Sequence, residues 1–164
     1  MAKGLSAAAQ RVQDALKALG VTSQVVELPE LTRSAAEAAQ AIGCRVEQIV
    51  KSLVFRGRST NRPILAVVSG GNRVDEEKLA VLVAEPVAKA DAEYVRQRTG
   101  YAIGGVPPVG HAESPVCVVD EDLLQYEQIW AAAGTPRAVF RLTPADLQRI
   151  TDCRIASLAA RRLT

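Results

Sequence analysis

The segment at residues 104–111, GGVPPVGH, constrains this chain more than any other stretch. It holds three glycines and two prolines in eight residues, and it ends in the only histidine of the chain, His111. Glycine lets the backbone approach a ligand closely and adopt conformations that other residues avoid, while proline fixes the turn. Such a loop can present rigid backbone N–H groups to a carbonyl or an oxyanion. A plain surface turn is the alternative, because glycine and proline punctuate loops in all proteins.

The composition predicts one domain, residues 1–164, with room for a sizeable core. Hydrophobic residues make up 48% of the chain but aromatic residues only 4%, so the core must be built from Ala, Val, Leu and Ile. The net charge of +2 is compatible with contact to the end of an RNA. A protein that wraps duplex DNA is usually far more basic, so we expect no DNA partner.

The cysteines Cys44, Cys117 and Cys153 are odd in number and widely separated, and no pair has the spacing of metal ligands. With a single histidine beside them, we expect neither a metal nor another cofactor. Reduced thiols in a cytoplasmic protein are the simplest interpretation. The first residues lack the apolar core of a signal peptide, and no apolar run reaches the roughly 18 residues of a membrane span, so we expect no membrane partner.

The apolar pattern indicates short helices and strands without a regular βαβ rhythm. Helical spacing and capping residues predict helices at residues 5–19, 35–42, 76–83, 92–99 and from 144 onward. Runs rich in β-branched residues predict strands at residues 23–28, 49–56, 64–69, 116–119 and 137–142. The tail beyond residue 152 is expected to fray. This order favours an α/β fold with a mixed sheet that can curl and with helices outside it.

The second strong feature is a lysine inside an apolar strand, QIVKSLVFRG. Alternation along the strand places Lys51 on the same face as Ile49, Leu53 and Phe55. A lysine in that setting must extend its ammonium group to water, meet an anion or lower its pKa. A lysine that protects an edge strand from aggregation is an equally good interpretation.

Several other residues are candidates with simpler alternatives. His111 is a possible general base, although a lone histidine often serves as a structural hydrogen-bonding group. Ser69 and Gly70 form a small-residue turn that either approaches a ligand or only connects two elements. Thr32 and Arg33 precede a helix N-terminus, where either anion binding or capping is expected. Three arginines, at positions 56, 58 and 62, form a candidate phosphate-contacting patch or a set of solvated loop charges.

Five segments in this order resemble a known family of proteins. They are TRSAAEAAQAIG, IVKSLVF, VVSGGNRVD, TGYAIGGVPPVGH and WAAAGTPRAVFRLTPADL, which together span roughly residues 25–147. The chain is similar to the YbaK/prolyl-tRNA synthetase-associated editing family, whose members hydrolyse wrongly aminoacylated tRNA. The essential lysine of the family corresponds to Lys51, and the loop motif corresponds to Gly105, Pro108, Gly110 and His111. The combination is more specific than either motif alone.

The resemblance implies a mixed α/β domain with a curled or barrel-like sheet and flanking helices. It also implies a free-standing aminoacyl-tRNA deacylase, because no synthetase catalytic or anticodon domain accompanies it. Backbone N–H groups near Gly104 and Gly105 would contact the ester carbonyl, and Lys51 would engage a phosphate of the terminal adenosine. Together with the candidates named above, the expected substrate-binding residues are Thr32, Arg33, Ser69, Gly70, Pro108 and Gly110. The family mechanism lets the ribose hydroxyl of the substrate activate the water, so no protein base and no metal are needed.

The resemblance leads to tRNA(Pro) as the expected substrate, with its acceptor end as the bound partner. The branch of the family that removes cysteine tends to end the loop in Gln, whereas this chain has His111, which favours alanine or another small residue. Docking on prolyl-tRNA synthetase is left open. Two alternatives also stay open, namely a non-catalytic module that binds tRNA or a synthetase, and a small-molecule binding domain unrelated to tRNA. An intact Lys51 favours the enzyme over the module.

Overall fold

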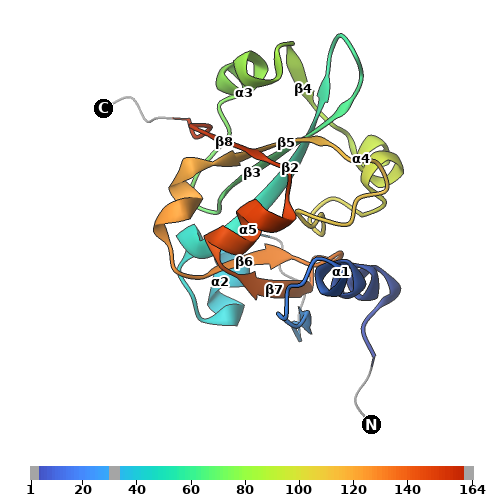
Figure 1. Ribbon diagram of the computed structural model, residues 1–164, viewed down its shortest axis with the longest axis vertical. Helices are drawn as coiled ribbons and strands as arrows, with labels where there is room; N and C mark the ends of the chain where they lie inside the picture. The colour runs from blue at the N-terminus through green and yellow to red at the C-terminus, as the bar shows by residue number, and fades with distance from the viewer. Residues whose placement is uncertain (1–3, 30–33, 161–164) are drawn as a thin grey trace.

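The computed structural model describes residues 4–29 and 34–160 and shows an α/β fold (Figure 1). The helices are α1 (Ala7–Ala18), α2 (Ala35–Ile42), α3 (Glu76–Val83), α4 (Ala92–Thr99) and α5 (Pro144–Ile150), with short 3₁₀ turns η1 (Val46–Gln48) and η2 (Glu121–Gln125). The strands are β1 (Val26–Glu27), β2 (Ile49–Gly57), β3 (Pro63–Ser69), β4 (Val87–Lys89), β5 (Val116–Asp120), β6 (Ile129–Ala132), β7 (Ala138–Leu142) and β8 (Arg154–Ala156). No helix in the described part of the chain is long and apolar enough to cross a membrane.

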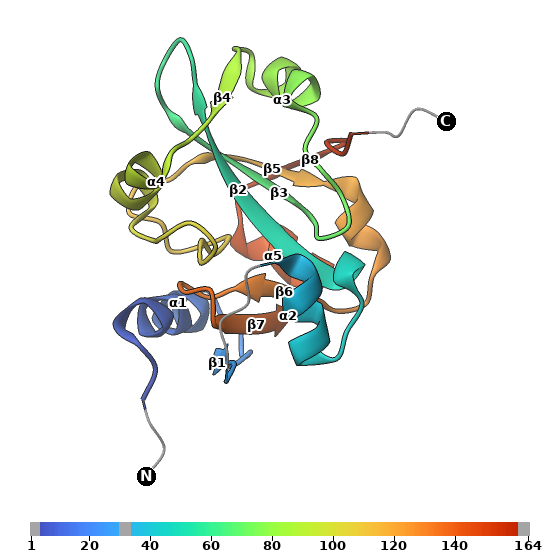
Figure 2. The same cartoon turned by 180° about the vertical axis from the view of Figure 1, so that it is seen from behind.

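The eight described strands form one mixed, open sheet (Figure 2). Its order is β1-β7-β6-β2-β3-β5-β8, and β4 pairs with β2 outside this path. The pairs β2–β6, β3–β5 and β5–β8 are parallel, and the other pairs are antiparallel. The expected mixed sheet with flanking helices is therefore confirmed.

Strand β2 changes its neighbour halfway along, and this change positions the site. On one side β3 pairs with β2 from Val50 to Arg56. On the other side β6 pairs only with Ile49 and Val50, and β4 takes over at Phe55. The stretch between them faces an opening in the sheet, because neither neighbour forms a ladder with it.

The helices begin and end at the residues that the sequence marks. The Ser34 hydroxyl accepts the Glu37 N–H at the start of α2, and Gly43 ends that helix with a left-handed φ of 88°. Asp75 and Asp91 accept backbone N–H groups at the starts of α3 and α4. These contacts satisfy N–H groups that a helix leaves unpaired in its first turn. The helix boundaries therefore follow from local chemistry.

The core lies on both faces of the central strands. Alternation along β3 sends Leu65 and Val67 to the cluster with α1, α4 and α5, and Ile64 to the cluster with α3. Strand β2 divides in the same way, because Val50 belongs to the first cluster and Phe55 to the second. Both strands are therefore covered by helices, as continuous apolar runs require.

Three strands, β4, β6 and β8, were not predicted from the sequence. Strand β8 also shows that one prediction was wrong. Strands β4 and β6 have only three and four residues, which is too short for a clear alternation. The tail was expected to fray, but its described part, up to residue 160, contains β8, and Leu158 after this strand is fully buried. The Leu158 N–H donates to the Asp120 carboxylate at 3.0 Å, which ties the tail to β5.

The cysteines give a second correction. Cys117 and Cys153 form a disulfide, with a Cα–Cα distance of 4.5 Å, and only Cys44 is free. The two residues are 36 positions apart, so their spacing gives no signal in the sequence. Parallel pairing of β5 with β8 brings them side by side. The expectation of three reduced thiols is therefore wrong for this pair.

Candidate active site

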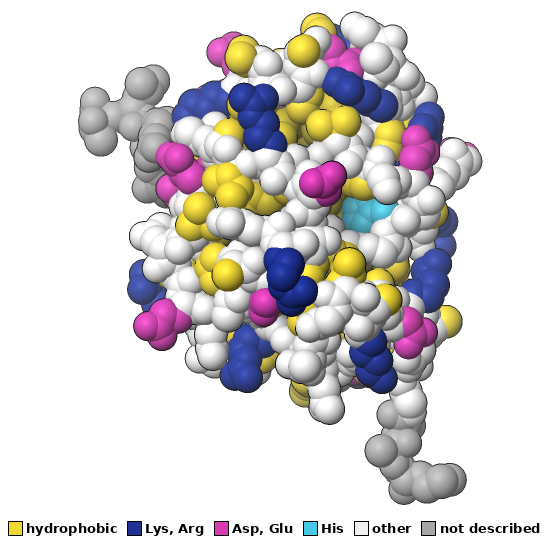
Figure 3. Space-filling model, viewed as in Figure 1, with side chains coloured by type: hydrophobic (Ala, Val, Ile, Leu, Met, Phe, Trp, Pro, Cys, Tyr) yellow, Lys and Arg dark blue, Asp and Glu magenta, His cyan; other side chains and the backbone are white. Residues whose placement is uncertain are grey.

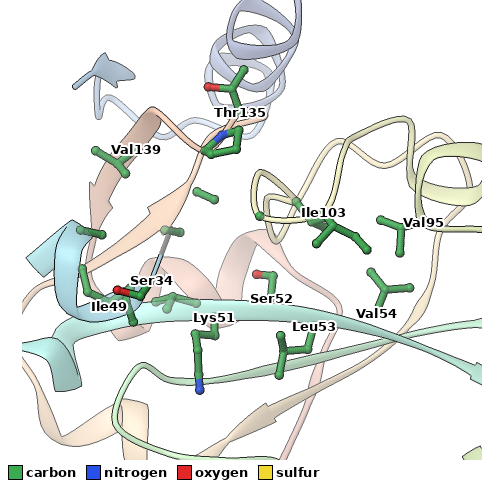
Figure 4. Close-up of a pocket in the computed structure, with 18 of the residues that line it drawn as sticks. Ser34, Ile49, Lys51, Ser52, Leu53, Val54, Val95, Ile103, Thr135 and Val139 are labelled. Carbon is green, nitrogen blue, oxygen red and sulfur yellow. The ribbon is translucent and has the colours of Figure 1, made fainter. Parts of the chain in front are cut away.

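A cavity of about 520 Å³ lies at the opening beside β2 (Figure 4). Its walls come from β2, from α2, from the turn between β6 and β7, and from the start of the glycine-rich loop. Most of the wall is apolar and carries small side chains such as Val50, Val54, Ala131 and Ala138. Two lysines, Lys51 and Lys89, also line it. The cavity wall is therefore largely apolar, with two lysines among the residues that line it.

Lys51 is half-buried, and no described carboxylate forms an ion pair with it. Its ammonium group donates to the backbone carbonyl of Asn72 at 2.5 Å. The Asn72 amide in turn donates to Asp122 at 2.8 Å and to Asp120 at 3.2 Å. Burial lowers the pKa of Lys51 below its usual value, and the positive charge of Arg73 lowers it further. Lys51 is therefore a cation without a local counter-charge, which is the condition of an anion-binding group.

The glycine-rich loop meets the cavity at Gly104, which has a left-handed φ of 89° and lines the wall. Gly105 is instead packed against the turn between β6 and β7, because a Cβ atom there would lie 2.6 Å from the Thr135 Cα. The Gly105 N–H donates to Ala102 at 3.0 Å, and its carbonyl accepts from Gly134 at 2.9 Å. Its N–H group is therefore engaged within the loop, and Gly104 is the glycine of this pair that reaches the cavity.

His111 holds the far end of the same loop together. Its Nε2 lies 2.5 Å from the Pro107 carbonyl, and since a carbonyl only accepts, Nε2 carries the proton. Burial lowers the pKa of His111, although the Pro107 contact opposes this shift. The Tyr101 hydroxyl donates to Gly110 at 2.9 Å beside it. Part of the His111 ring is visible at the surface in Figure 3, but His111 does not line the cavity.

Three of the remaining candidate residues, Ser69, Gly70 and Pro108, do not line the cavity. The Ser69 hydroxyl donates to the Glu47 carbonyl at 2.7 Å, and a Cβ at Gly70 would lie 2.4 Å from the Val46 carbonyl. Both residues therefore serve the contact between β3 and η1. Pro108 is buried inside its loop. Thr32 and Arg33 lie outside the described residues.

The candidate arginine patch is smaller in the structure than in the sequence. Arg62 forms an ion pair with Glu85 at 2.7 Å and also donates to the Val83 carbonyl. Charges of both signs are interspersed on the face seen in Figure 3. This arrangement agrees with a net charge of only +2.

Residues 29–150 match the family model of the aminoacyl-tRNA editing domain, and this match covers most of the chain. The chain belongs to this family. The geometry and the family match therefore point to the same part of the molecule, because the cavity, Lys51 and the glycine-rich loop all lie within the matched residues of the editing domain.

Three known proteins are similar to this editing domain over most of its length. A solved structure described as a candidate trans-editing enzyme for prolyl-tRNA synthetase is 52% identical, with a TM-score of 0.91 over 96% of this chain and 100% of that one. Protein YwhH of Bacillus subtilis is 29% identical over 81% of this chain and 84% of its own length. EbsC of Enterococcus faecalis, named as a candidate Cys-tRNA(Pro)/Cys-tRNA(Cys) deacylase, is 28% identical over 78% of each chain.

Several residues of the editing-domain cavity were not predicted from the sequence. Ser52 follows Lys51 directly and points to the opposite side of β2 in Figure 4. Thr135 belongs to the turn against which the glycine-rich loop packs, and Ile103 stands 55% exposed at the mouth. The sequence offered one hint for two of them, which is that Ser52 is adjacent to Lys51 and Ile103 is adjacent to Gly104. Lys89 and Trp130 lie on the two short strands that alternation did not identify.

Proposed function

We propose that this editing domain acts in trans as a hydrolase that removes a small non-cognate amino acid, foremost alanine, from tRNA(Pro). The observation that carries the proposal is that Lys51 and Gly104 line one cavity whose remaining wall is largely apolar. The similarity to a candidate trans-editing enzyme for prolyl-tRNA synthetase supports tRNA(Pro) as the substrate. The acceptor end of the tRNA is the part that enters the cavity.

The chemistry needs three contributions from the site. Lys51 binds a phosphate next to the terminal adenosine as a point charge, since no described carboxylate neutralises it. The backbone at Gly104 stabilises the oxygen that becomes negative when the ester carbonyl is attacked. Water adds to the carbonyl carbon, the bond to the ribose oxygen breaks, and that oxygen leaves with a proton. The neighbouring ribose hydroxyl of the substrate orients the water, so the reaction uses no protein base.

The apolar wall selects the acyl group by size. Val50, Val54 and Ala131 face the opening, so an aliphatic side chain is received there without unpaired polar atoms. Each methylene of the substrate changes discrimination by about 1–3 kcal/mol, so a small cavity favours small residues only gradually. We expect alanine to be removed fastest and proline to be left in place.

The test is a deacylation panel with tRNA(Pro) charged with Ala, Cys, Ser and Pro. The wild-type protein should hydrolyse Ala-tRNA(Pro), and Lys51→Met should abolish this activity because it keeps the length of the side chain and removes the charge. Lys17→Met, on the exposed surface of α1, is the matched control and should keep full activity. A thermal melt confirms that each variant folds.

Two results would contradict the proposal. A folded wild-type protein that binds charged tRNA and hydrolyses none of the four esters would indicate the non-catalytic module instead. Near-normal hydrolysis by a folded Lys51→Met variant would remove Lys51 from the site. Hydrolysis of small free aminoacyl esters in place of charged tRNA would point to the small-molecule alternative.

A further inference from the structure

Three hydroxyl side chains line the cavity, and one of them has no partner. The Ser34 hydroxyl accepts the Glu37 N–H, and the Thr135 hydroxyl accepts the N–H groups of Arg137 and Ala138. The Ser52 hydroxyl is buried and has no hydrogen-bond partner in the described part of the chain. Its side chain points into the space between β2, the β6–β7 turn and the glycine-rich loop (Figure 4). A buried hydroxyl without a partner is costly, so its presence here calls for a ligand.

The backbone of Ser52 faces the same opening. Gly70 donates to Ile49, and Gly57 donates to Arg62, so the odd-numbered residues of β2 direct their polar groups toward β3. The even-numbered residues therefore direct theirs the other way. On that side the ladder with β6 ends at Val50, and hydrogen bonding next to β4 begins at Val54, whose carbonyl accepts the Ala90 N–H at 3.3 Å. The N–H and C=O of Ser52 lie between them and have no ladder partner.

The acceptors on this edge suit a ligand that carries its own hydrogen-bond donors. No aspartate or glutamate is among the described residues that line the cavity. The ammonium group of Lys51 points away from the Ser52 side of β2, toward Asn72 (Figure 4). The Ser52 hydroxyl and the Ser52 carbonyl are two neutral acceptors of one residue.

We propose that Ser52 binds the α-ammonium group of the aminoacyl ester through its hydroxyl and its backbone carbonyl. An α-amino acyl group carries an N–H group and a carbonyl in the same order as a residue of a β-strand. It therefore takes the place of the missing strand neighbour between β6 and β4, with its ester carbonyl toward the free N–H groups of β2. This inference rests on the proposed function and adds to it the group that distinguishes an aminoacyl ester from other esters.

The experiment compares alanyl-tRNA(Pro) with lactyl-tRNA(Pro), in which a hydroxyl replaces the α-ammonium group. Each enzymatic rate is divided by the spontaneous hydrolysis rate of the same ester. The wild-type protein should prefer the alanyl ester at least about tenfold, as expected for a charged hydrogen bond. Ser52→Ala should lower alanyl hydrolysis by about tenfold and lactyl hydrolysis by less than about twofold. Ser52→Thr keeps the hydroxyl and should keep the preference.

The outcomes separate this inference from the proposed function. If Ser52→Ala slows both esters equally, or neither, Ser52 does not bind the α-ammonium group although the deacylase stands. If Ser52→Ala slows only the hydrolysis of seryl-tRNA(Pro), the Ser52 hydroxyl contacts the side chain of the acyl group, and the inference is wrong. If the wild-type protein hydrolyses no aminoacyl-tRNA at all, the proposed function fails first.

Discussion

Lys51 and His111 are both partly buried, and their surroundings lower the pKa of each. The Lys51 ammonium group donates a hydrogen bond to one neutral carbonyl. Because a carbonyl carries no negative charge, it does not neutralise the lysine. His111 uses its single ring proton on the Pro107 carbonyl, and its Nδ1 atom is buried without a described partner. The histidine therefore supports the loop in its neutral form, whereas the Lys51 ammonium group hydrogen-bonds only to the Asn72 carbonyl among the described residues.

The lowered pKa of His111 makes the stability of the loop depend on pH. Above the usual pKa of 6.5 the ring is neutral in both the folded and the unfolded chain, so it contributes no pH dependence. As the pH falls from 6.5 to the lowered pKa, the unfolded chain binds the proton first, and stability is lost. His111→Gln keeps an N–H donor and does not titrate. Urea unfolding at about pH 7.5 and about pH 5.5 should show a smaller loss for the variant. Equal losses in both proteins would contradict the assignment.

Ser52 should cost the fold stability, because its buried hydroxyl has no partner. We expect Ser52→Ala to unfold at the same temperature as the wild type or higher, with a gain of up to about 1 kcal/mol. Ser34→Ala is the matched control, since that hydroxyl caps α2 and its loss should cost about 1 kcal/mol. Thermal melts of the wild type, Ser52→Ala and Ser34→Ala compare the three melting temperatures directly. A clear destabilisation by Ser52→Ala would indicate a structural role.

At the scale of elements, the glycine-rich loop is held by the turn between β6 and β7. Gly105 exchanges one hydrogen bond with Gly134 and lies against the Thr135 backbone. Gly134 itself lies against α1, where a Cβ would be 2.7 Å from the Ala8 carbonyl oxygen. The position of Gly104 at the cavity therefore depends on two successive close backbone contacts, one between the loop and the turn and one between the turn and α1.

Gly105→Ala should separate this contact from ordinary glycine flexibility. The new Cβ would meet the Thr135 backbone at 2.6 Å, so we expect a loss of about 1–3 kcal/mol and a strong loss of deacylation. Gly71→Ala is the control, because its Cβ would lie 3.4 Å from the flexible Glu47 side chain. Chemical unfolding and the alanyl-tRNA(Pro) assay should be measured on both. Equal behaviour of the two variants would show that the loop is free to move.

The longer elements could be predicted from the sequence, since β2, β3 and the helices carry alternation, capping residues or terminal glycines. The family resemblance also singled out Lys51, which is one of the two lysines that line the cavity, and the structure adds where its ammonium group points. The short strands β4, β6 and β8 could not be predicted, because their pairing depends on residues far away in the chain. Ser52 was missed for the same reason. Its importance comes from an interruption in the pairing of β2, which no local pattern reveals.

At the scale of the whole molecule, the disulfide fastens the C-terminal strand to the sheet. Closing a loop between residues 36 positions apart should stabilise the fold by about 3–4 kcal/mol. Dithiothreitol should therefore lower the melting temperature of the wild type and leave that of Cys153→Ala unchanged. A thiol titration of the untreated, unfolded protein should find one reactive group, Cys44. Three reactive thiols would contradict the disulfide.

The sheet order also decides when the site comes into existence during synthesis. Strand β2 and its partner β3 leave the ribosome together, whereas β6 and β7, which form the opposite wall, follow more than 70 residues after β2 begins. Until then the nascent chain presents an apolar strand with an open edge, and such edges pair readily with other chains. The gap beside β2 that we propose as the substrate site is thus exposed in the unfinished protein. A chain truncated before β6 should aggregate through it.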